Sequence, residues 1–249
     1  MKNILTVILL IFAHLSFSQA ISYRYITPVK GHGQEFRKAL GEKTKKYNSK
    51  EDEPRLYTFG IRASQNGSMM GVLRMTYGET LGELQGGSNQ PGMMDYWMKN
   101  VDIHIESSSS SEIFLRRESA TYNDAVGTEK PFRRVFHYNI KHGHQDKFWK
   151  VRDNLPAAIE KSGVDLDINS FISFAGGSRQ HARIVIFGES MKSFEPGSGD
   201  WGRLSDAYNE LYGNDSWEID WELSNSSLLD YGNSMELLEF LPELSSPIY

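Results

Sequence analysis

The sequence predicts an α+β protein made of two similar halves, each a sheet with helices on one face. Three observations predict this fold class. A turn-and-helix stretch at residues 29–36 recurs at residues 140–148, and each copy follows a strand-like run rich in aromatic residues. Strand-like and helix-like runs then follow both copies in the same order. Such a recurrence of element order indicates a duplicated unit.

The first half alternates runs of period two with runs of helical period. Its strands and helices are expected over residues 22–27, 34–47, 55–63, 69–77, 93–105 and 112–118. The first helix carries Phe36, Leu40 and Tyr47 on one side and lysines on the other. Asn66-Gly67 separates the second and third strands, and this dipeptide is a strong hairpin signal.

The second half repeats the pattern after a polar linker at residues 121–132. Its strands and helices are expected over residues 133–140, 145–161, 169–175, 181–187, 201–212 and 234–241. An additional acidic segment near residues 214–232 contains Trp217 and Trp221, and it is placed to cover one end of the fold.

Each half therefore has the order β-α-β-β-α-β, which is the ferredoxin-like arrangement of an antiparallel sheet with helices on one face. We expect one such half at residues 21–120 and the other at residues 133–249. A single unit leaves the second face of its sheet bare, and an apolar face of that size needs a partner. The two halves are expected to pack face to face as a pseudo-dimeric α+β barrel.

In this element order, and in the turn from Val29 to Phe36 with its second copy, the chain resembles the dimeric α+β barrel superfamily in a fused tandem form. That superfamily includes the NIPSNAP-type proteins, the antibiotic-biosynthesis monooxygenases and the EthD-like proteins. The resemblance implies a small-molecule pocket between the sheets and cofactor-free oxidation chemistry, and it permits haem binding.

The first twenty residues have the pattern of a secretory signal peptide. A short basic start is followed by the apolar run 4–13 and by small residues up to Ala20. The mature protein is therefore expected to be secreted or periplasmic, with cleavage after Ser18 or after Ala20. The alternative is a buried N-terminal helix. No later stretch has the roughly 20 apolar residues of a membrane span.

Composition excludes several function classes. The 249 residues include no cysteine, which excludes a thiol nucleophile and Cys-ligated metal centres. The formal net charge is −5, and the acids concentrate between Glu195 and Glu243. Such a surface repels phosphate backbones, so we expect no nucleic-acid partner. A solvated acidic face and a site for a cationic ligand both fit this segment. The oligomeric state leaves no signal in the sequence.

Polar side chains on the predicted strands suggest a site between the sheets. On the strand 133–140, Phe136 and Tyr138 are expected to face the helices, so that His137 and Asn139 point into the central space. Aligning the two copies by their aromatic residues places Arg24 opposite His137, also pointing inward. On the neighbouring strands Arg62 and Arg74 are expected to join them. This set suits an anionic or oxygenated ligand, with His137 as a catalytic base. The alternatives are arginines that reach solvent at strand ends, or reversed faces.

Other polar clusters have simpler structural interpretations. His32, His142 and His144 lie in the repeated turn without a third ligand at metal-binding spacing, so turn geometry and helix capping explain them. Glu79 and Glu189 occupy matching helix-start positions. We expect neither a metal site nor a cofactor.

These observations favour a secreted small-molecule-binding protein, or a cofactor-free monooxygenase-like enzyme, with its pocket between the two sheets. One alternative is a non-catalytic cell-envelope interaction module that uses the Trp-bearing segment 214–232. Another is a haem-binding protein, for which His137 is the candidate ligand.

Overall fold

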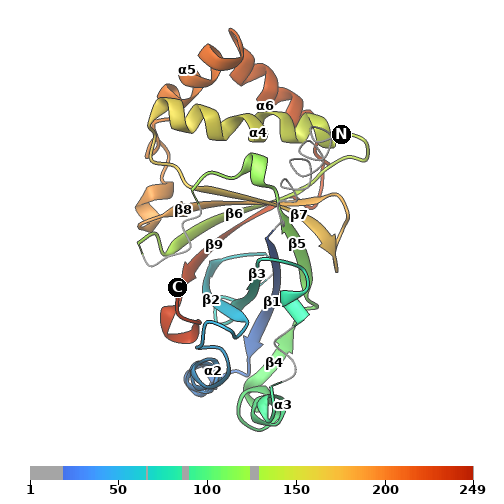
Figure 1. Ribbon diagram of the computed structural model, residues 1–249, viewed down its shortest axis with the longest axis vertical. Helices are drawn as coiled ribbons and strands as arrows, with labels where there is room; N and C mark the ends of the chain where they lie inside the picture. The colour runs from blue at the N-terminus through green and yellow to red at the C-terminus, as the bar shows by residue number, and fades with distance from the viewer. Residues whose placement is uncertain (1–18, 66, 86–89, 124–128, 249) are drawn as a thin grey trace, which may run out of the picture.

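Eight antiparallel strands close into a barrel in the computed structural model, which describes residues 19–65, 67–85, 90–123 and 129–248 (Figure 1). A ninth, short strand extends one edge. The strands are β1 Ala20–Pro28, β2 Arg55–Ala63, β3 Val72–Gly78, β4 Ile105–Ser108, β5 Glu112–Arg116, β6 Phe132–Asn139, β7 Ile168–Ala175, β8 His181–Gly188 and β9 Ser234–Phe240. Around the barrel the order is β1-β3-β2-β9-β6-β8-β7-β5, and β5 pairs with β1 to close the ring, while β4 pairs with the end of β1.

The helices lie outside the barrel on two opposite sides (Figure 1). They are α2 Gly33–Tyr47, α3 Met93–Tyr96, α4 Gln145–Ser162, α5 Trp201–Tyr212 and α6 Ser216–Ser226. Helices α4, α5 and α6 cover the side of β6, β7 and β8, and α2 and α3 lie on the side of β1, β2 and β3 (Figure 1). The helix expected at residues 93–105 is irregular, because α3 continues as a π-helical turn, Trp97–Val101, and a 3₁₀ turn. None of the helices in the described ranges is long and apolar enough to cross a membrane.

The repeated turn forms in both halves with the same geometry. Gly31 and Gly143 have φ angles of 89° and 78°, a region that glycine enters without steric penalty. The helix that follows starts two residues later in each copy, with His32 and His144 at the N-cap positions. Neither histidine makes a side-chain capping hydrogen bond, so the expected capping role is wrong. Equivalent residues of the two halves are therefore 112 positions apart, from Gly31 to Gly143.

The barrel interior is an apolar core to which all eight strands contribute. Its members include the aromatic side chains Tyr23, Tyr25, Tyr57, Phe59, Phe114, Phe171, Phe187 and Phe240. A second cluster lies between α4 and the outer face of β6, β7 and β8, and a third between α2 and the outer face of β1 and β3. Interior and exterior positions alternate along each strand, as the pleat of a β-strand requires.

The predicted faces are right in the second half and reversed on the first strand of the first half. Val135 belongs to the barrel interior, whereas Phe136 and Tyr138 pack in the cluster under α4. In β1, however, Tyr23 and Tyr25 occupy the interior. The alignment by aromatic residues was off by one position, since the shared turn places Tyr23 opposite Val135. A slip of one residue moves every side chain of a strand to the other face.

Several other expectations can be placed. Residues 1–18 of the expected signal peptide, Asn66 of the hairpin and residues 124–128 of the linker lie outside the described residues. Ala20, at the expected cleavage point, is fully buried in β1. The additional segment 214–232 contains α6, which packs against α4.

Candidate functional site

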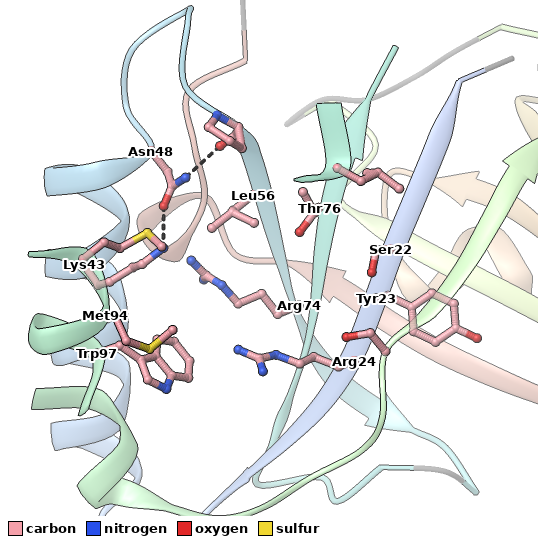
Figure 2. A pocket seen from close by; sticks show the side chains of 14 residues that line it. Ser22, Tyr23, Arg24, Lys43, Asn48, Leu56, Arg74, Thr76, Met94 and Trp97 are labelled. Carbon is pink, nitrogen blue, oxygen red and sulfur yellow. Dashed lines mark hydrogen bonds between the residues drawn. The ribbon is translucent and has the colours of Figure 1, made fainter. Parts of the chain in front are cut away.

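A pocket of about 350 Å³ opens between the outer face of β1, β2 and β3 and the helices α2 and α3. Figure 2 shows the guanidinium groups of Arg24 and Arg74 and the amine of Lys43 converging on it, with the ring of Tyr23 turned away. No described Asp or Glu is among the lining residues, which include Ser22, Asn48, Leu56, Thr76, Met93, Met94 and Trp97. We name Arg24, Lys43 and Arg74 the cationic triad.

Arg74 forms the floor of the pocket and is almost completely buried. Its Nη1 donates to Thr58 Oγ1 at 2.9 Å and to the Leu244 carbonyl at 3.3 Å, and its Nη2 donates to Thr44 Oγ1 at 2.8 Å. All these acceptors are neutral. Burial, and next the charge of Arg24, lower the pKa of Arg74 to about 9. The guanidinium is thus held in place by hydrogen bonds but lacks a counter-charge.

Lys43 reaches the pocket from α2 and is 5% exposed. Its Nζ donates to Asn48 Oδ1 at 2.6 Å, and Asn48 is fixed in turn by donating its amide to the Pro54 carbonyl at 2.9 Å. Burial, followed by the charges of Arg74 and Arg24, lowers the pKa of Lys43 to about 7, against a small opposing effect of Glu53. At neutral pH the amine therefore exists in both protonation states.

Arg24 lies directly across from Arg74 in the β1–β3 pairing. Its guanidinium sits 5.0 Å from the centre of the Trp97 ring, a cation–π arrangement. Within the described part of the chain its side chain makes no hydrogen bond and no ion pair. Burial lowers the pKa of Arg24, and Asp102 opposes this effect. Like charges in directly opposite strand positions destabilise a sheet, so this pair is costly for folding.

The second half shows what the fold itself requires at these positions. The residues equivalent to Arg24 and Lys43 are Phe136 and Leu155, and the strand partner of Phe136 is Ile184. All three are apolar members of the cluster under α4. At these three positions the second half therefore carries apolar side chains, and the first half carries cations around a cavity. The second half also buries one cation, Arg152 of α4, but that side chain is enclosed by the aromatic rings of Tyr138, Phe148 and Trp221. Buried cations at positions where apolar side chains would stabilise the fold are expected at a functional site.

The sequence-predicted set is not brought together. Arg24 and Arg74 share the pocket, but on the helix side of the sheet and not in the central space. Arg62 lies at the end of β2, where it is half-exposed and forms an ion pair with Glu239. Asn139 lies at the end of β6 and donates to the Gly232 carbonyl at 2.7 Å. The alternative of arginines at strand ends describes Arg62 correctly.

His137 does point into the barrel, where it joins a chain of acids and histidines. Its Nε2 lies 3.1 Å from Glu236 Oε2, and its Nδ1 lies 3.0 Å from Nε2 of His181. His181 Nδ1 lies 3.6 Å from Glu112 Oε2. Glu236 also accepts hydrogen bonds from Tyr25 at 2.5 Å and from Ser64 at 2.6 Å. Burial lowers the pKa of His137 although Glu236 opposes this effect. The barrel interior also buries Arg133, Asn169 and Arg183, which line the small cavity inside it, and Arg133 and Arg183 lie over the rings of Phe187 and Tyr23.

The residues present do not fit a haem. Both ring nitrogens of His137 are engaged with protein groups, and its side chain is 3% exposed. The pocket with the cationic triad has no histidine among its lining residues, and neither has the cavity of about 60 Å³ inside the barrel. Among the described residues no group of three or more His, Cys, Asp or Glu could hold a metal ion. His32 and His104 approach each other to 3.1 Å on the surface without a third candidate ligand.

The two tryptophans of the segment 214–232 pack within the protein. Trp217 and Trp221 are partly buried against the cluster under α4. Their rings lie 5.7 Å apart in an edge-to-face arrangement, and Trp217 also contacts Tyr208. These rings therefore stabilise the packing of α6 on the rest of the second half.

Sequence reasoning missed Lys43 and Trp97, although one of them left a signal. Phe36, Leu40, Lys43 and Tyr47 follow the spacing of a single helix face, so Lys43 interrupts an apolar stripe. Assigning all the lysines of α2 to the solvent side was wrong for this residue. Trp97 carried no comparable signal, because it lies in an irregular π-helical turn.

The fold has clear structural neighbours. They are proteins of the dimeric α+β barrel type. A candidate monooxygenase from Fusobacterium nucleatum has a TM-score of 0.60 at 7% identity, with 91% of this chain and 94% of that chain covered. An anthrone oxidase-like protein has a TM-score of 0.54 at 9% identity, with 90% and 92% covered. A chlorite dismutase mutant from Candidatus Nitrospira defluvii, in complex with cyanide, has a TM-score of 0.50 at 10% identity, with 91% and 92% covered.

These similarities concern the fold, because the identities are 10% or lower. No protein-family model matches the sequence. A search of curated proteins gave no match either.

Proposed function

We propose that this protein binds an anionic or readily ionised, flat small molecule in the pocket of the cationic triad. The observation that carries the proposal is the presence of Arg24, Lys43 and Arg74 around a cavity, whereas the equivalent positions of the other half carry apolar side chains. The pocket volume of about 350 Å³ lies within the range of small-molecule sites. The site proposed here lies between sheet and helices, and not between the two sheets.

The physical argument is one of charge compensation. Buried charges are normally paired, because an unpaired one loses its hydration without recovering the energy elsewhere. An anionic ligand would supply the missing counter-charge, and each charge-assisted hydrogen bond contributes about 1.5–3 kcal/mol. Trp97 and Met94 add a flat, polarisable wall, and Ser22 and Thr76 add hydroxyl groups. An aromatic or conjugated acid matches both features.

The same groups would serve a cofactor-free monooxygenase-like enzyme. Such chemistry needs a base to take a proton from the substrate and cations to stabilise the resulting oxyanion. An amine with a pKa near 7 is matched to the first task, and the two guanidinium groups are placed for the second. The names of the neighbours, a candidate monooxygenase and an anthrone oxidase-like protein, support this branch by analogy.

The repeated order of elements also bears on how the barrel is built from the two halves of the chain. Residues of the first half contribute the strand order β5-β1-β3-β2, and residues of the second half contribute β9-β6-β8-β7. We propose that these are two fused ferredoxin-like units, each completing the other's sheet through β2–β9 and β5–β7 pairing. Export through an N-terminal signal, to the periplasm or beyond, belongs to the same proposal.

The test compares two flat probes of nearly equal shape, 2-naphthoate and its neutral amide, by calorimetric titration. We expect the naphthoate to bind at least about tenfold more tightly than the amide, which corresponds to 1.4 kcal/mol. Arg24→Gln should abolish this preference without breaking a hydrogen bond or an ion pair, because in the described part of the chain the Arg24 side chain makes neither and lies over the Trp97 ring. Arg37→Gln is the matched control, since Arg37 is an exposed arginine on α2. Equal binding of both probes, or equal loss in both variants, would contradict the proposal.

A further inference from the structure

The amine of Lys43 has an unusual environment for a lysine. It lines the pocket, it is almost fully buried, and the charges of Arg74 and Arg24 act on it, while no described acid forms an ion pair with it. Lysines next to other cations in desolvated sites lose their proton more easily and become nucleophiles. The exposed lysines on the same helix, Lys45 and Lys46, lack this environment.

Hydrogen bonding also orients the amine. Lys43 Nζ donates to Asn48 Oδ1 at 2.6 Å, and the Asn48 amide is anchored on the Pro54 carbonyl. A neutral amine that donates one N–H to a fixed acceptor keeps its lone pair directed elsewhere. Because Asn48 and Lys43 both line the pocket, the lone pair is available to a molecule bound there.

We propose that Lys43 forms an imine with an oxo acid, a molecule that carries a ketone or aldehyde group next to a carboxylate. The inference rests on the proposed function, because the guanidinium groups of Arg24 and Arg74 would hold the carboxylate. It adds the class of ligand and the bond that forms. A carboxylate held by these groups brings its neighbouring carbonyl carbon within the same small cavity as the amine.

The step is balanced without any further reagent. The amine lone pair attacks the carbonyl carbon, and the carbonyl π electrons move to oxygen. A proton moves from nitrogen to that oxygen, which gives a neutral carbinolamine. Loss of hydroxide with a second proton from nitrogen releases one water and leaves a C=N bond. Arg24 and Arg74 stabilise the negative charge on the carboxylate throughout.

The test is reductive trapping with pyruvate and sodium cyanoborohydride at pH 7, followed by intact mass measurement and peptide mapping. We expect one adduct per chain, with a mass equal to that of pyruvic acid less one oxygen atom, on the peptide that contains Lys43. Lactate, which has a hydroxyl group in place of the ketone, should give no adduct. Lys45→Met should behave as the wild type. Lys43→Arg keeps a positive charge but has no nucleophilic amine, so it should lose the adduct.

Two results would overturn the inference, and they are distinguishable from failure of the proposed function. If pyruvate binds by calorimetry but gives no adduct, the pocket takes an anion and Lys43 is not a nucleophile. If adducts spread over surface lysines and persist in Lys43→Arg, the labelling is non-specific and the inference is wrong. If neither pyruvate nor 2-naphthoate binds, the pocket is not an anion site and both proposals fail.

Discussion

Replacing Lys43 by methionine should make the protein more stable at neutral pH while it weakens anion binding. Methionine has nearly the same length and no charge, and the equivalent position in the second half is the apolar Leu155. The variant therefore restores the interface that the fold forms elsewhere in the same chain. Gains in stability at the expense of function are typical of sites that hold unfavourable groups for a purpose.

The magnitude follows from the pKa of Lys43. Burial and the two arginines lower it from 10.5 to about 7, and each unit corresponds to 1.36 kcal/mol. The unfolded chain therefore holds the proton more tightly than the folded chain at every pH between these values. This penalises the folded state by about 4 kcal/mol at pH 7. Methionine removes that penalty but also the hydrogen bond to Asn48, which contributes about 1 kcal/mol. The net expected gain is about 3 kcal/mol.

The pH dependence gives the sharper check. The penalty is complete below about pH 7 and disappears as the pH rises towards 10.5, where the lysine is neutral in both states. Urea denaturation of both proteins at a series of pH values should show a difference that shrinks steadily above pH 7. A Lys43→Met variant that is less stable than the wild type at pH 7, or a difference independent of pH, would refute this reasoning.

Three further predictions concern other parts of the molecule. Glu236→Gln should lower the free energy of unfolding at pH 7 by about 2–4 kcal/mol, because it removes the charge that strengthens the buried hydrogen bonds from Tyr25 and Ser64. Burial raises the pKa of Glu236, but His137 and then Arg183 lower it to about 2. The stability that the ionised Glu236 contributes should therefore be complete above pH 4.5 and vanish as the pH falls towards 2. If the difference in stability between the two proteins does not change between pH 4.5 and pH 2, the prediction is wrong. Arg62→Ala should change the free energy of unfolding by less than about 1 kcal/mol, since the ion pair of Arg62 with Glu239 is half-exposed. Naphthoate binding should be unaltered, and weakened binding would show that Arg62 belongs to the site. Under the proposed export, intact mass of the processed protein should place its first residue at Gln19, because the Gln19 carbonyl accepts a hydrogen bond from the Arg116 backbone and Ala20 is buried in β1. A chain starting at Ile21 would contradict that placement.

The fold was largely predictable because its signals are redundant. The order of strands and helices is written in the sequence twice, so an error in one copy is corrected by the other. The glycine turn, which demands a positive φ at Gly31 and Gly143, gives the alignment of the halves directly. Aromatic residues give a false alignment here, because they fill the barrel interior in the first half and the helix interface in the second.

The site was less predictable for a related reason. Arg24 and Arg74 were selected as a pair, and the structure does place them opposite each other. The face of the sheet on which they lie was predicted wrongly, because the two halves were aligned with a shift of one residue. Since side chains alternate between the faces of a strand, that shift moves all of them to the other face. Lys43 was hidden among other lysines of α2, and Trp97 belongs to a π-helical turn that periodicity cannot detect.

Calorimetric titration of 2-naphthoate at pH 7, in two buffers of different ionisation enthalpy, tests the central claim most directly. An anion that enters the cationic triad should favour the protonated form of Lys43, whose pKa burial and the two arginines lower to about 7. We therefore predict binding coupled to the uptake of a fraction of a proton, and no uptake in Lys43→Met. Absence of binding, or binding with the same proton balance in both proteins, would contradict the account.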